Sequence, residues 1–332
     1  MTKVAINGLG RIGRATLKII LENPDLELIA VNDLVPLENL VYLLKYDTVF
    51  GRYEKPIKSD GNRIIIDDKS LMVYSSKNPE ELPWAELGVQ IVFECTGKFT
   101  GKNDLQKHLQ AGAKSVILSA ASKDNIETVI TGVSSSPTAT NLISCASCTT
   151  NCVIPVLEIM DRRVGVQKAI MTTVHAYTAS QKIVDAPHKK ASRGRAGAQN
   201  IVPTSTGAAT ATSFVLPQYK EKFDGLALRV PVINGSLADI TFVTSRDTSV
   251  DELIKIFKEE SESERYKNIV AVTQDPLVSS DIIKDPHPSI IDLNLIKVVD
   301  KNLVKIMSWY DNEWAYASQM VREALIIGKT FH

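Results

Sequence analysis

Short hydrophobic runs alternate with helical patterns through the first half of the chain. The runs are continuous, which is typical of parallel strands buried on both faces of a sheet. Between them, hydrophobic residues recur at helical spacing at 16–23 and 103–111. Strand, helix and strand in this order predict βαβ units and a doubly wound sheet. The expected strands are Val4–Asn7, Leu28–Asn32, Ile91–Cys95 and Ser115–Ser119.

After about residue 165 the pattern changes to longer runs in which hydrophobic and polar positions alternate, which predicts a mixed or antiparallel sheet. A polar, Lys/Arg-rich segment without a clear period, Ala176–Asn200, interrupts these runs. A loop of this length inside a compact domain usually serves a function. Glu313–Lys329 carries hydrophobic residues on one helical face and should pack against other elements. The alternating runs are Lys168–His175, Leu226–Val232, Ala238–Thr244 and Leu303–Tyr310.

These patterns predict an α/β protein of two domains, since 332 residues exceed the usual length of one domain, about 100–200 residues. We expect an N-terminal doubly wound Rossmann-type domain at residues 1–148, joined by the C-terminal helix at 313–332. An α+β catalytic domain with a mixed or antiparallel sheet is expected at residues 149–312.

Charge and hydropathy narrow the classes of partner. Lys plus Arg and Asp plus Glu both number 38, so no overall field favours nucleic acid or an anionic membrane. No hydrophobic stretch reaches the ~18–20 residues that span a bilayer, and the N-terminus lacks the pattern of a secretion signal. We therefore expect a cytoplasmic protein with no membrane partner and no nucleic acid as its main partner.

The segment Gly8–Gly13, GLGRIG, lies between the first expected strand and the first helix. Glycines at this turn let the chain approach a pyrophosphate, and the helix N-terminus attracts its charge. By itself the pattern is also compatible with a glycine-rich turn that binds nothing. Asp33 ends the second expected strand 20 residues after Gly13, where an acid that binds ribose is expected. The two features together predict a dinucleotide site.

Three of the four cysteines fall within eight residues, at Cys145, Cys148 and Cys152, and the fourth is Cys95. A helix expected from Thr149 to Arg163 places Cys148 at its N-terminus, which can lower the pKa of a thiol and make it a nucleophile. Pro155 argues against an uninterrupted helix. The alternatives are buried, unreactive cysteines, or zinc at the C-x-x-C pair. No second pair completes a zinc site, so we predict no metal.

Two residues are candidate partners of the Cys148 thiol. His175 ends a hydrophobic run and opens the polar loop, where a catalytic base could face a cleft, although a histidine satisfied in the core would show the same pattern. The other four histidines, His108, His188, His287 and His332, are expected at the surface. Cys145 could capture an oxidised Cys148 as a disulfide, unless a buried strand position keeps Cys145 inert.

Six segments occur in the order and spacing of one family: GLGRIG after VAIN, then ASCTTNC, MTTVHAYT, STGAA, LRVP and SWYDNEWAY. Over essentially its whole length the chain resembles the phosphorylating glyceraldehyde-3-phosphate dehydrogenases. The ASCTTN and WYDNE elements are far more specific than the glycine pattern. The resemblance implies oxidation of D-glyceraldehyde 3-phosphate to 1,3-bisphosphoglycerate with NAD and inorganic phosphate, in glycolysis or gluconeogenesis. It also implies a homotetramer in which Ala176–Asn200 lines the neighbour's cofactor site.

Carried over residue by residue, the resemblance makes Cys148 the nucleophile, which forms a hemithioacetal and then a thioester, and His175 its base. It assigns the attacking phosphate to Ser147, Thr149, Thr206 and Gly207, and the phosphate of the substrate to Thr178 and Arg229. The implied cofactor residues are Gly8, Gly10, Arg11, Ile12, Gly13, Asp33, Lys77, Ser119 and Asn312.

The chain departs from the family pattern at a few positions. Cys145 replaces the usual asparagine. Ala186 is an unusual residue at its position, which leaves the choice between NAD and NADP slightly open. The run Lys189–Arg195 lacks the usual arginine pattern, so we assign no phosphate contact there. Three other activities are weighed: an erythrose-4-phosphate dehydrogenase, a cysteine hydrolase on a nucleotide-binding fold, and a non-catalytic binding protein on the same fold. A hydrolase has no use for the glycine segment and Asp33.

Overall fold

Two compact units make up the chain in the computed structural model, which describes residues 1–122, 124, 126–134 and 140–331. The first unit contains residues 1–129, 135–146 and 317–332, and the second contains residues 130–134 and 147–316. His332, expected at the surface, lies outside the described residues. None of the helices described is both long and apolar enough to cross a membrane.

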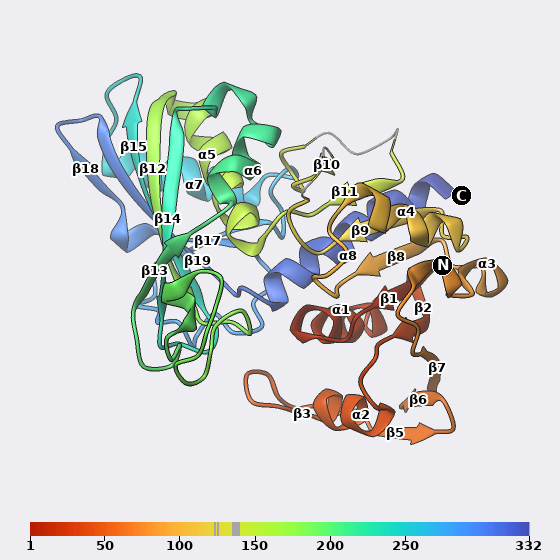
Figure 1. Cartoon of the computed structure of the whole chain (residues 1–332). Helices are drawn as coiled ribbons and strands as arrows, with labels where there is room; N and C mark the ends of the chain where they lie inside the picture. Colours follow the sequence, from red (N-terminus) through yellow and green to blue (C-terminus); the bar gives the residue numbers. More distant parts are fainter. Residues whose placement is uncertain (123, 125, 135–139, 332) are drawn as a thin grey trace. The chain divides into compact units, whose positions relative to one another are not determined.

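A nine-stranded sheet runs through the first unit in the order β10-β11-β9-β8-β1-β2-β7-β6-β5 (Figure 1). The strands from β10 to β7 pair in parallel, and β5 and β6 are antiparallel at one edge. The four strands predicted from the hydrophobic runs lie together at the centre, as β9, β8, β1 and β2. The predicted α/β fold with a doubly wound sheet is therefore confirmed.

The strands of the first unit are β1 (Thr2–Asn7), β2 (Leu26–Asn32), β5 (Ile57–Asp60), β6 (Arg63–Ile66), β7 (Lys69–Tyr74), β8 (Ile91–Glu94), β9 (Ser115–Leu118), β10 (Glu127–Thr128) and β11 (Leu142–Ser144), with a separate hairpin of β3 (Tyr46–Asp47) and β4 (Gly51–Arg52). Its helices are α1 (Arg11–Leu21), α2 (Leu37–Lys45), α3 (Trp84–Leu87), α4 (Lys102–Gln110) and the 3₁₀ turn η1 (Pro79–Glu81). The expected C-terminal helix is α8 (Trp314–Gly328), followed by η5 (Lys329–Phe331).

Polar residues end three neighbouring strands of this sheet. Glu94 ends β8, Asn7 ends β1 and Asn32 ends β2, and strand pairing places all three in one buried row. His108 of α4 is also completely buried, so the prediction that it lies at the surface is wrong. Its ring hydrogen bonds to Trp84 and Glu94 in the core, and these bonds satisfy both ring nitrogens.

The second unit contains a mixed sheet in the order β13-β14-β12-β15-β19-β17-β16, with β18 paired to β19. Its strands are β12 (Val166–Ala176), β13 (Val202–Ser205), β14 (Phe223–Val230), β15 (Ser236–Thr244), β16 (Val270–Thr273), β17 (Ser289–Asp292), β18 (Lys297–Val299) and β19 (Leu303–Tyr310). Its helices are α5 (Cys148–Val164), α6 (Ala208–Val215) and α7 (Val250–Glu262), with the 3₁₀ turns η2 (Ala191–Gly194), η3 (Pro217–Tyr219) and η4 (Leu293–Leu295). The four alternating runs are β12, β14, β15 and β19, as predicted.

One face of this second sheet is covered by helices. Helix α5 contacts β12, β15, β17 and β19, while α6 contacts β14 and α7 contacts β16 (Figure 1). Because side chains alternate along a strand, the residues of β12 and β19 that meet α5 include His175 and Tyr310. Residues of opposite parity, such as Ile170, Leu226 and Leu303, are exposed.

Helix α5 is capped by Ser147, whose Oγ accepts the N–H of Thr150, and it continues through Pro155 to Val164. The helix predicted from Thr149 to Arg163 is therefore confirmed, without an interruption at Pro155. Pro155 is buried along with most of the helix, so tertiary packing outweighs the loss of one backbone hydrogen bond.

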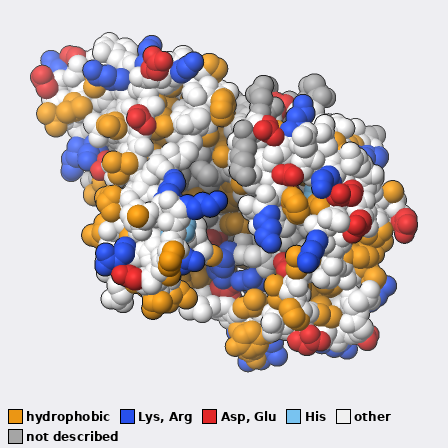
Figure 2. All heavy atoms as spheres, in the orientation of Figure 1, with side chains coloured by type: hydrophobic (Ala, Val, Ile, Leu, Met, Phe, Trp, Pro, Cys, Tyr) orange, Lys and Arg blue, Asp and Glu red, His pale blue; other side chains and the backbone are white. Residues whose placement is uncertain are grey.

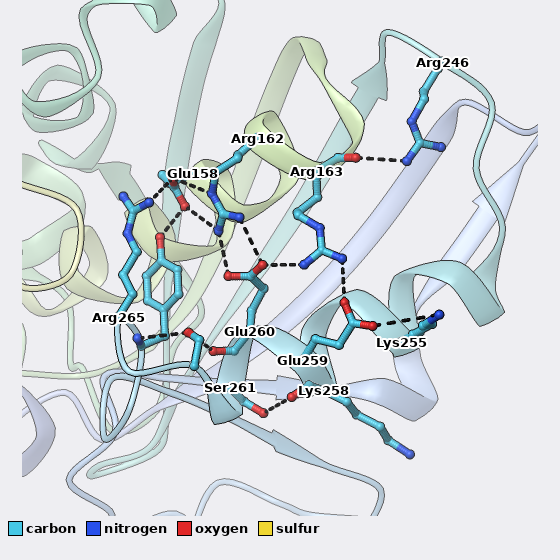
Figure 3. Close-up of polar contacts among 12 residues, drawn as sticks. Glu158, Arg162, Arg163, Arg246, Lys255, Lys258, Glu259, Glu260, Ser261 and Arg265 are labelled. Carbon is cyan, nitrogen blue, oxygen red and sulfur yellow. Dashed lines mark hydrogen bonds and ion pairs between the residues drawn. The ribbon is translucent and has the colours of Figure 1, made fainter.

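Ion pairs join the end of α5 to α7 (Figure 3). The carboxylate of Glu260, on α7, accepts hydrogen bonds from Arg162 at 2.6 Å and from Arg163 at 2.5 Å. Arg163 also pairs with Glu259 at 2.6 Å. Glu260 is only 6% exposed, so these two guanidinium groups compensate a buried charge.

Candidate nucleophile and dinucleotide loop

The glycine segment forms a tight turn between β1 and α1. Gly8 has a φ of +94°, and a Cβ there would lie 2.8 Å from the backbone nitrogen of Thr96. A Cβ on Gly13 would lie 1.9 Å from the carbonyl oxygen of Gly8. Only glycine fits these two places, whereas a Cβ on Gly10 meets nothing within 4 Å. The turn is thus packed on its inner side and open at Gly10, as the close approach of a pyrophosphate requires.

Asp33 is held against this turn from the end of the neighbouring strand. Its Oδ2 accepts the N–H of Leu9 at 2.7 Å and its Oδ1 accepts the N–H of Val35 at 2.9 Å. A carboxylate oxygen can accept a second hydrogen bond, so Asp33 retains capacity for ribose hydroxyls. The turn and Asp33 together fit a dinucleotide.

The other predicted cofactor residues differ in exposure and in hydrogen-bond partners. The side chain of Arg11 pairs with Asp47 at 2.6 Å, and its backbone N–H lies at the start of α1, where an anion is favoured. Ile12 and Ser119 are partly exposed and Lys77 is exposed. Asn312, in the second unit, is buried and accepts a hydrogen bond from Ser236 at 2.8 Å.

Cys148 is the first residue of α5 and carries the proposed nucleophile. Its Sγ lies 3.4 Å from Nε2 of His175, the penultimate residue of β12. Ala146, two residues earlier, adopts a φ of +53° although it is not a glycine. The capped helix start and the end of the strand therefore bring together the thiol and imidazole that the sequence singles out.

The carbonyl of Ala176 orients the imidazole of His175. Nδ1 lies 2.7 Å from this oxygen, and Nη1 of Arg229 donates to the same oxygen at 2.9 Å. Nη1 also lies 2.5 Å from Nδ1. With Nδ1–H donating to Ala176, the lone pair of Nε2 faces the sulfur of Cys148, as a base must.

Burial sets the protonation of the pair. It lowers the pKa of His175 to about 3, with help from the charges of Arg229 and Arg193, so the ring is neutral near pH 7. Burial also raises the pKa of the Cys148 thiol, and the charge of Arg229 and the N–H groups of Thr149 and Cys148 lower it without cancelling that effect. The helix start therefore lowers the pKa of Cys148, as predicted, but burial raises it by more, so the net shift is upward. A thiol with a raised pKa needs a base to become a nucleophile, and the imidazole of His175 lies within reach of it.

Tyr310 completes this arrangement, and we did not predict it from the sequence. Its hydroxyl hydrogen bonds to Thr149 at 2.9 Å and to Thr173 at 2.7 Å, and its ring packs edge-on against His175 with centroids 5.9 Å apart. The signal was available, because a tyrosine in an alternating strand must find a partner for its hydroxyl when buried. Tyr310 therefore links the start of α5 to β12.

The predicted phosphate-binding residues lie in four segments of this unit. Arg229 is beside His175, and its buried Nε has no hydrogen-bond partner among the described residues. Thr178 hydrogen bonds to Ser180 at 2.9 Å. Thr206 and Gly207 precede α6, and a Cβ on Gly207 would meet nothing within 4 Å. Ser147 caps α5, and the hydroxyl of Thr149 is buried against Tyr310.

Arg193, in the long loop, is a second functional candidate that we did not assign from the sequence. Its Nε donates to Thr204 at 2.9 Å and its Nη1 lies 3.5 Å from Ser180, which bonds to Thr178. Its charge also acts on His175. The abundance of Lys and Arg in this loop was a signal, but spacing alone did not show which side chain turns towards Thr178.

The remaining cysteines are not arranged as nucleophiles. All four are free, and Cys145 and Cys152 are buried. Burial raises the pKa of Cys145 well above its ordinary value and that of Cys152 to about 12, which favours the inert alternative for Cys145. The sulfur of Cys152 donates to Ser308 at 3.3 Å. Among the described residues, no group of three or more His, Cys, Asp or Glu is placed to hold a metal ion.

Comparison with known proteins identifies the family of the chain. Residues 2–102 match the family model for the NAD binding domain of glyceraldehyde 3-phosphate dehydrogenase, and residues 147–312 match that for its C-terminal domain. The chain is 46% identical over 330 residues to a glyceraldehyde-3-phosphate dehydrogenase of Streptomyces coelicolor, covering 98% of both chains. It is 44% identical over 328 residues to that of Geobacillus stearothermophilus, again covering 98% of both.

Proposed function

Because the chain belongs to the glyceraldehyde-3-phosphate dehydrogenase family, we propose that Cys148 and His175 are the nucleophile and base with which it oxidises glyceraldehyde 3-phosphate. The protein is an NAD-dependent oxidoreductase of glycolysis. The observation that carries the residue assignment is the 3.4 Å approach of Cys148 Sγ to His175 Nε2 at the start of α5.

The first half of the reaction oxidises the aldehyde on the enzyme. Nε2 of neutral His175 takes the thiol proton while the sulfur of Cys148 bonds to the aldehyde carbon, and the proton passes to the carbonyl oxygen to give a hemithioacetal. The backbone N–H of Cys148, at the helix start, stabilises charge on that oxygen. His175 then takes the hydroxyl proton as hydride leaves the carbon. Bound NAD supplies the acceptor for that hydride, and the carbon becomes a thioester.

The second half releases the product. An oxygen of inorganic phosphate attacks the thioester carbon, the carbon–sulfur bond breaks, and Cys148 recovers its thiol with the proton held on His175. The product, 1,3-bisphosphoglycerate, keeps the energy of oxidation as an acyl phosphate. The enzyme therefore needs two anion sites, one for each phosphate.

The donors of the second unit support two such sites. We assign the phosphate of the substrate to Thr178 and Arg229, whose Nε has no partner among the residues described, and add Arg193 to this group. The attacking phosphate is assigned to Ser147, Thr206 and Gly207 at the starts of α5 and α6, where helix dipoles favour anions. Thr149 completes this assignment.

The cofactor assignment follows the two units. We assign NAD to the domain predicted from the sequence at residues 1–148 with the C-terminal helix 313–332, and catalysis to residues 149–312 together with Cys148 at the domain boundary. Gly8, Gly10, Arg11, Ile12, Gly13 and Asp33 would hold the pyrophosphate and ribose. Lys77, Ser119 and Asn312 remain assigned to the cofactor by family resemblance.

A homotetramer is part of the proposal. The uncovered face of the second sheet exposes Ile170 by 62% and Leu226 by 46%, and Ile183 and Val184 in the long loop are more exposed still. Figure 2 shows hydrophobic side chains at the surface between mixed acidic and basic ones. A sheet face and a loop that expose several large apolar side chains are compatible with contact to another subunit. Four free cysteines fit the reducing cytoplasm in which we place the enzyme.

An absorbance assay of NADH formation tests the proposal. Glyceraldehyde 3-phosphate should yield NADH in sustained turnover only with inorganic phosphate, and Cys148→Ser should bind NAD but yield none. Normal turnover by Cys148→Ser would overturn the assignment. Erythrose 4-phosphate, assayed in parallel, should turn over more slowly, and hydrolysis of esters without NAD would instead favour a cysteine hydrolase.

A further inference from the structure

A buried carboxylate lies beneath the dinucleotide loop and has no role in the chemistry above. Glu94 is completely buried at the end of β8. Its Oε2 accepts Nδ2–H of Asn7 at 2.6 Å and faces Nε2 of His108 at 3.1 Å. Its Oε1 accepts the backbone N–H of Thr96 at 2.8 Å and also its hydroxyl. Four donor groups therefore face this one carboxyl group, which fixes its position in the core.

Trp84 fixes the orientation of His108. The indole Nε1–H can only donate, and it lies 3.1 Å from Nδ1 of His108. Nδ1 must therefore present its lone pair, and the proton of the neutral ring lies on Nε2, directed at Glu94. The rings of Trp84 and His108 also stack, with centroids 6.4 Å apart.

Glu94 reaches the glycine turn by two routes. The first route is Asn7, the residue before Gly8, whose side chain donates to Glu94 and accepts a hydrogen bond from Asn32 at 2.7 Å. Asn32 in turn accepts the backbone N–H of Gly8 at 2.8 Å and precedes Asp33. Through Thr96 it holds the segment on which Gly8 packs so closely that no Cβ fits.

We propose that Glu94 is a positioning residue for the cofactor: with His108 behind it, it holds Asn7 and Thr96 so that the Gly8 turn and Asp33 are preformed for NAD. A preformed loop avoids paying ordering entropy on binding. Loss of this carboxylate therefore weakens NAD without altering the reacting groups at Cys148. The inference rests on the proposed placement of NAD at Gly8–Gly13 and Asp33.

Glu94→Gln tests this directly, because an amide N–H₂ then meets donors from Asn7, His108 or Thr96. Titration calorimetry of the full-length protein with NAD should show a roughly 3- to 30-fold higher Kd. The KM for NAD should rise while kcat at saturating NAD stays unchanged. If Glu94→Gln fails to fold, Thr96→Val, which removes the hydroxyl that donates to Glu94 and accepts the N–H of Lys98 at 3.1 Å, should weaken NAD in the same direction by a smaller factor.

A polarity swap separates positioning from general damage. In the double variant Asn7→Asp/Glu94→Gln, the new amide at residue 94 donates to the new carboxylate at residue 7. That carboxylate can still accept the hydrogen bond from Asn32. It also lies close to His108, because Nδ2 of Asn7 is 3.4 Å from Nε2 of His108 in the wild type. The swap should restore most of the NAD affinity lost in Glu94→Gln. Glu260→Gln, which removes a buried carboxylate charge between Arg162 and Arg163 (Figure 3), should lower thermal stability and leave NAD affinity unchanged.

Two results would count against different claims. If Glu94→Gln binds NAD as tightly as the wild type while Asp33→Ala binds it weakly, the positioning role of Glu94 is wrong and the cofactor placement stands. If Asp33→Ala also binds NAD normally, the placement itself fails. A swap variant no better than Glu94→Gln would reduce Glu94 to a structural residue.

Discussion

His175 and Arg229 occupy the same register on the parallel strands β12 and β14 and share the carbonyl oxygen of Ala176. Sharing this acceptor has two effects. It holds Nδ1–H of His175 in place, and it keeps a fixed positive charge next to a neutral imidazole. Burial, reinforced by the charge of Arg229, lowers the pKa of His175, so the proposed base is unprotonated at rest and its Nε2 is free to accept the proton of Cys148.

His175→Asn should lower turnover by ~10²–10⁴, the usual contribution of a positioned general base. Asparagine keeps polarity at the site but cannot accept the thiol proton. Steady-state NADH formation measures the loss. Alkylation of Cys148 by iodoacetamide near pH 7 should also slow, and an unchanged alkylation rate would mean that His175 does not activate the thiol.

Acid should destabilise the wild type more than His175→Asn. Burial lowers the pKa of His175 from 6.5 to about 3 in the folded protein, so between these values only the unfolded chain takes up the proton. Stability from this group is complete above pH ~6.5 and falls by up to about 1.4 kcal/mol per pH unit below it. Urea unfolding at pH 7.5 and 5.5 compares the two proteins, and equal losses would contradict the neutral buried imidazole.

Tyr310→Phe should cost about 1–3 kcal/mol of stability, because the hydroxyls of Thr149 and Thr173 lose their shared partner. It should also lower kcat by loosening the helix start that carries Cys148. Tyr53→Phe is a suitable control, since the buried hydroxyl of Tyr53 has no hydrogen-bond partner in the described part of the chain. Equal effects of both substitutions on kcat would contradict a specific role of Tyr310 in positioning Cys148.

Asp33→Ala should weaken NAD binding and narrow the preference for NAD over NADP. The carboxylate can accept ribose hydroxyls and repels a 2′-phosphate, and Leu34 offers no cation to compensate. Ratios of kcat/KM with the two cofactors provide the measurement. Equal use of both cofactors by the wild type would show that Asp33 does not set the choice.

Arg193→Gln should raise the KM for glyceraldehyde 3-phosphate roughly 10- to 100-fold, since a charged hydrogen bond to the phosphate is lost. Arg195→Gln is the matched control, because Arg195 pairs with Asp185 at 2.7 Å and is exposed. A similar change in both variants would indicate a general effect of loop charge and not a contact of Arg193.

Elements with strong local patterns could be predicted from the sequence. The central strands of the first sheet and the long strands of the second emerged because buried and half-buried strands differ in periodicity. Cys148 and His175 emerged because one precedes a helix and the other ends a strand. Their positions at the ends of secondary-structure elements are local features, so the sequence pattern indicates them, whereas their approach to 3.4 Å depends on the fold.

Features that depend on long-range packing escaped prediction. The burial of His108 follows from Trp84 and Glu94, which lie 24 and 14 residues away in the chain. Tyr310 lies 161 residues from Thr149. The raised pKa of Cys148 is also a tertiary effect, because it arises from burial by the folded chain and not from the helix start.

The left-handed backbone at Ala146 restricts the conformations of the turn that leads into Cys148. Glycine would adopt this conformation without penalty, and an alanine there costs roughly 1 kcal/mol. Glycine would also widen the conformational choice of the two residues that lead into Cys148. A directed-evolution campaign that selects only for thermostability would therefore favour the more permissive residue at 146, and its products should be screened for turnover before the substitution is kept.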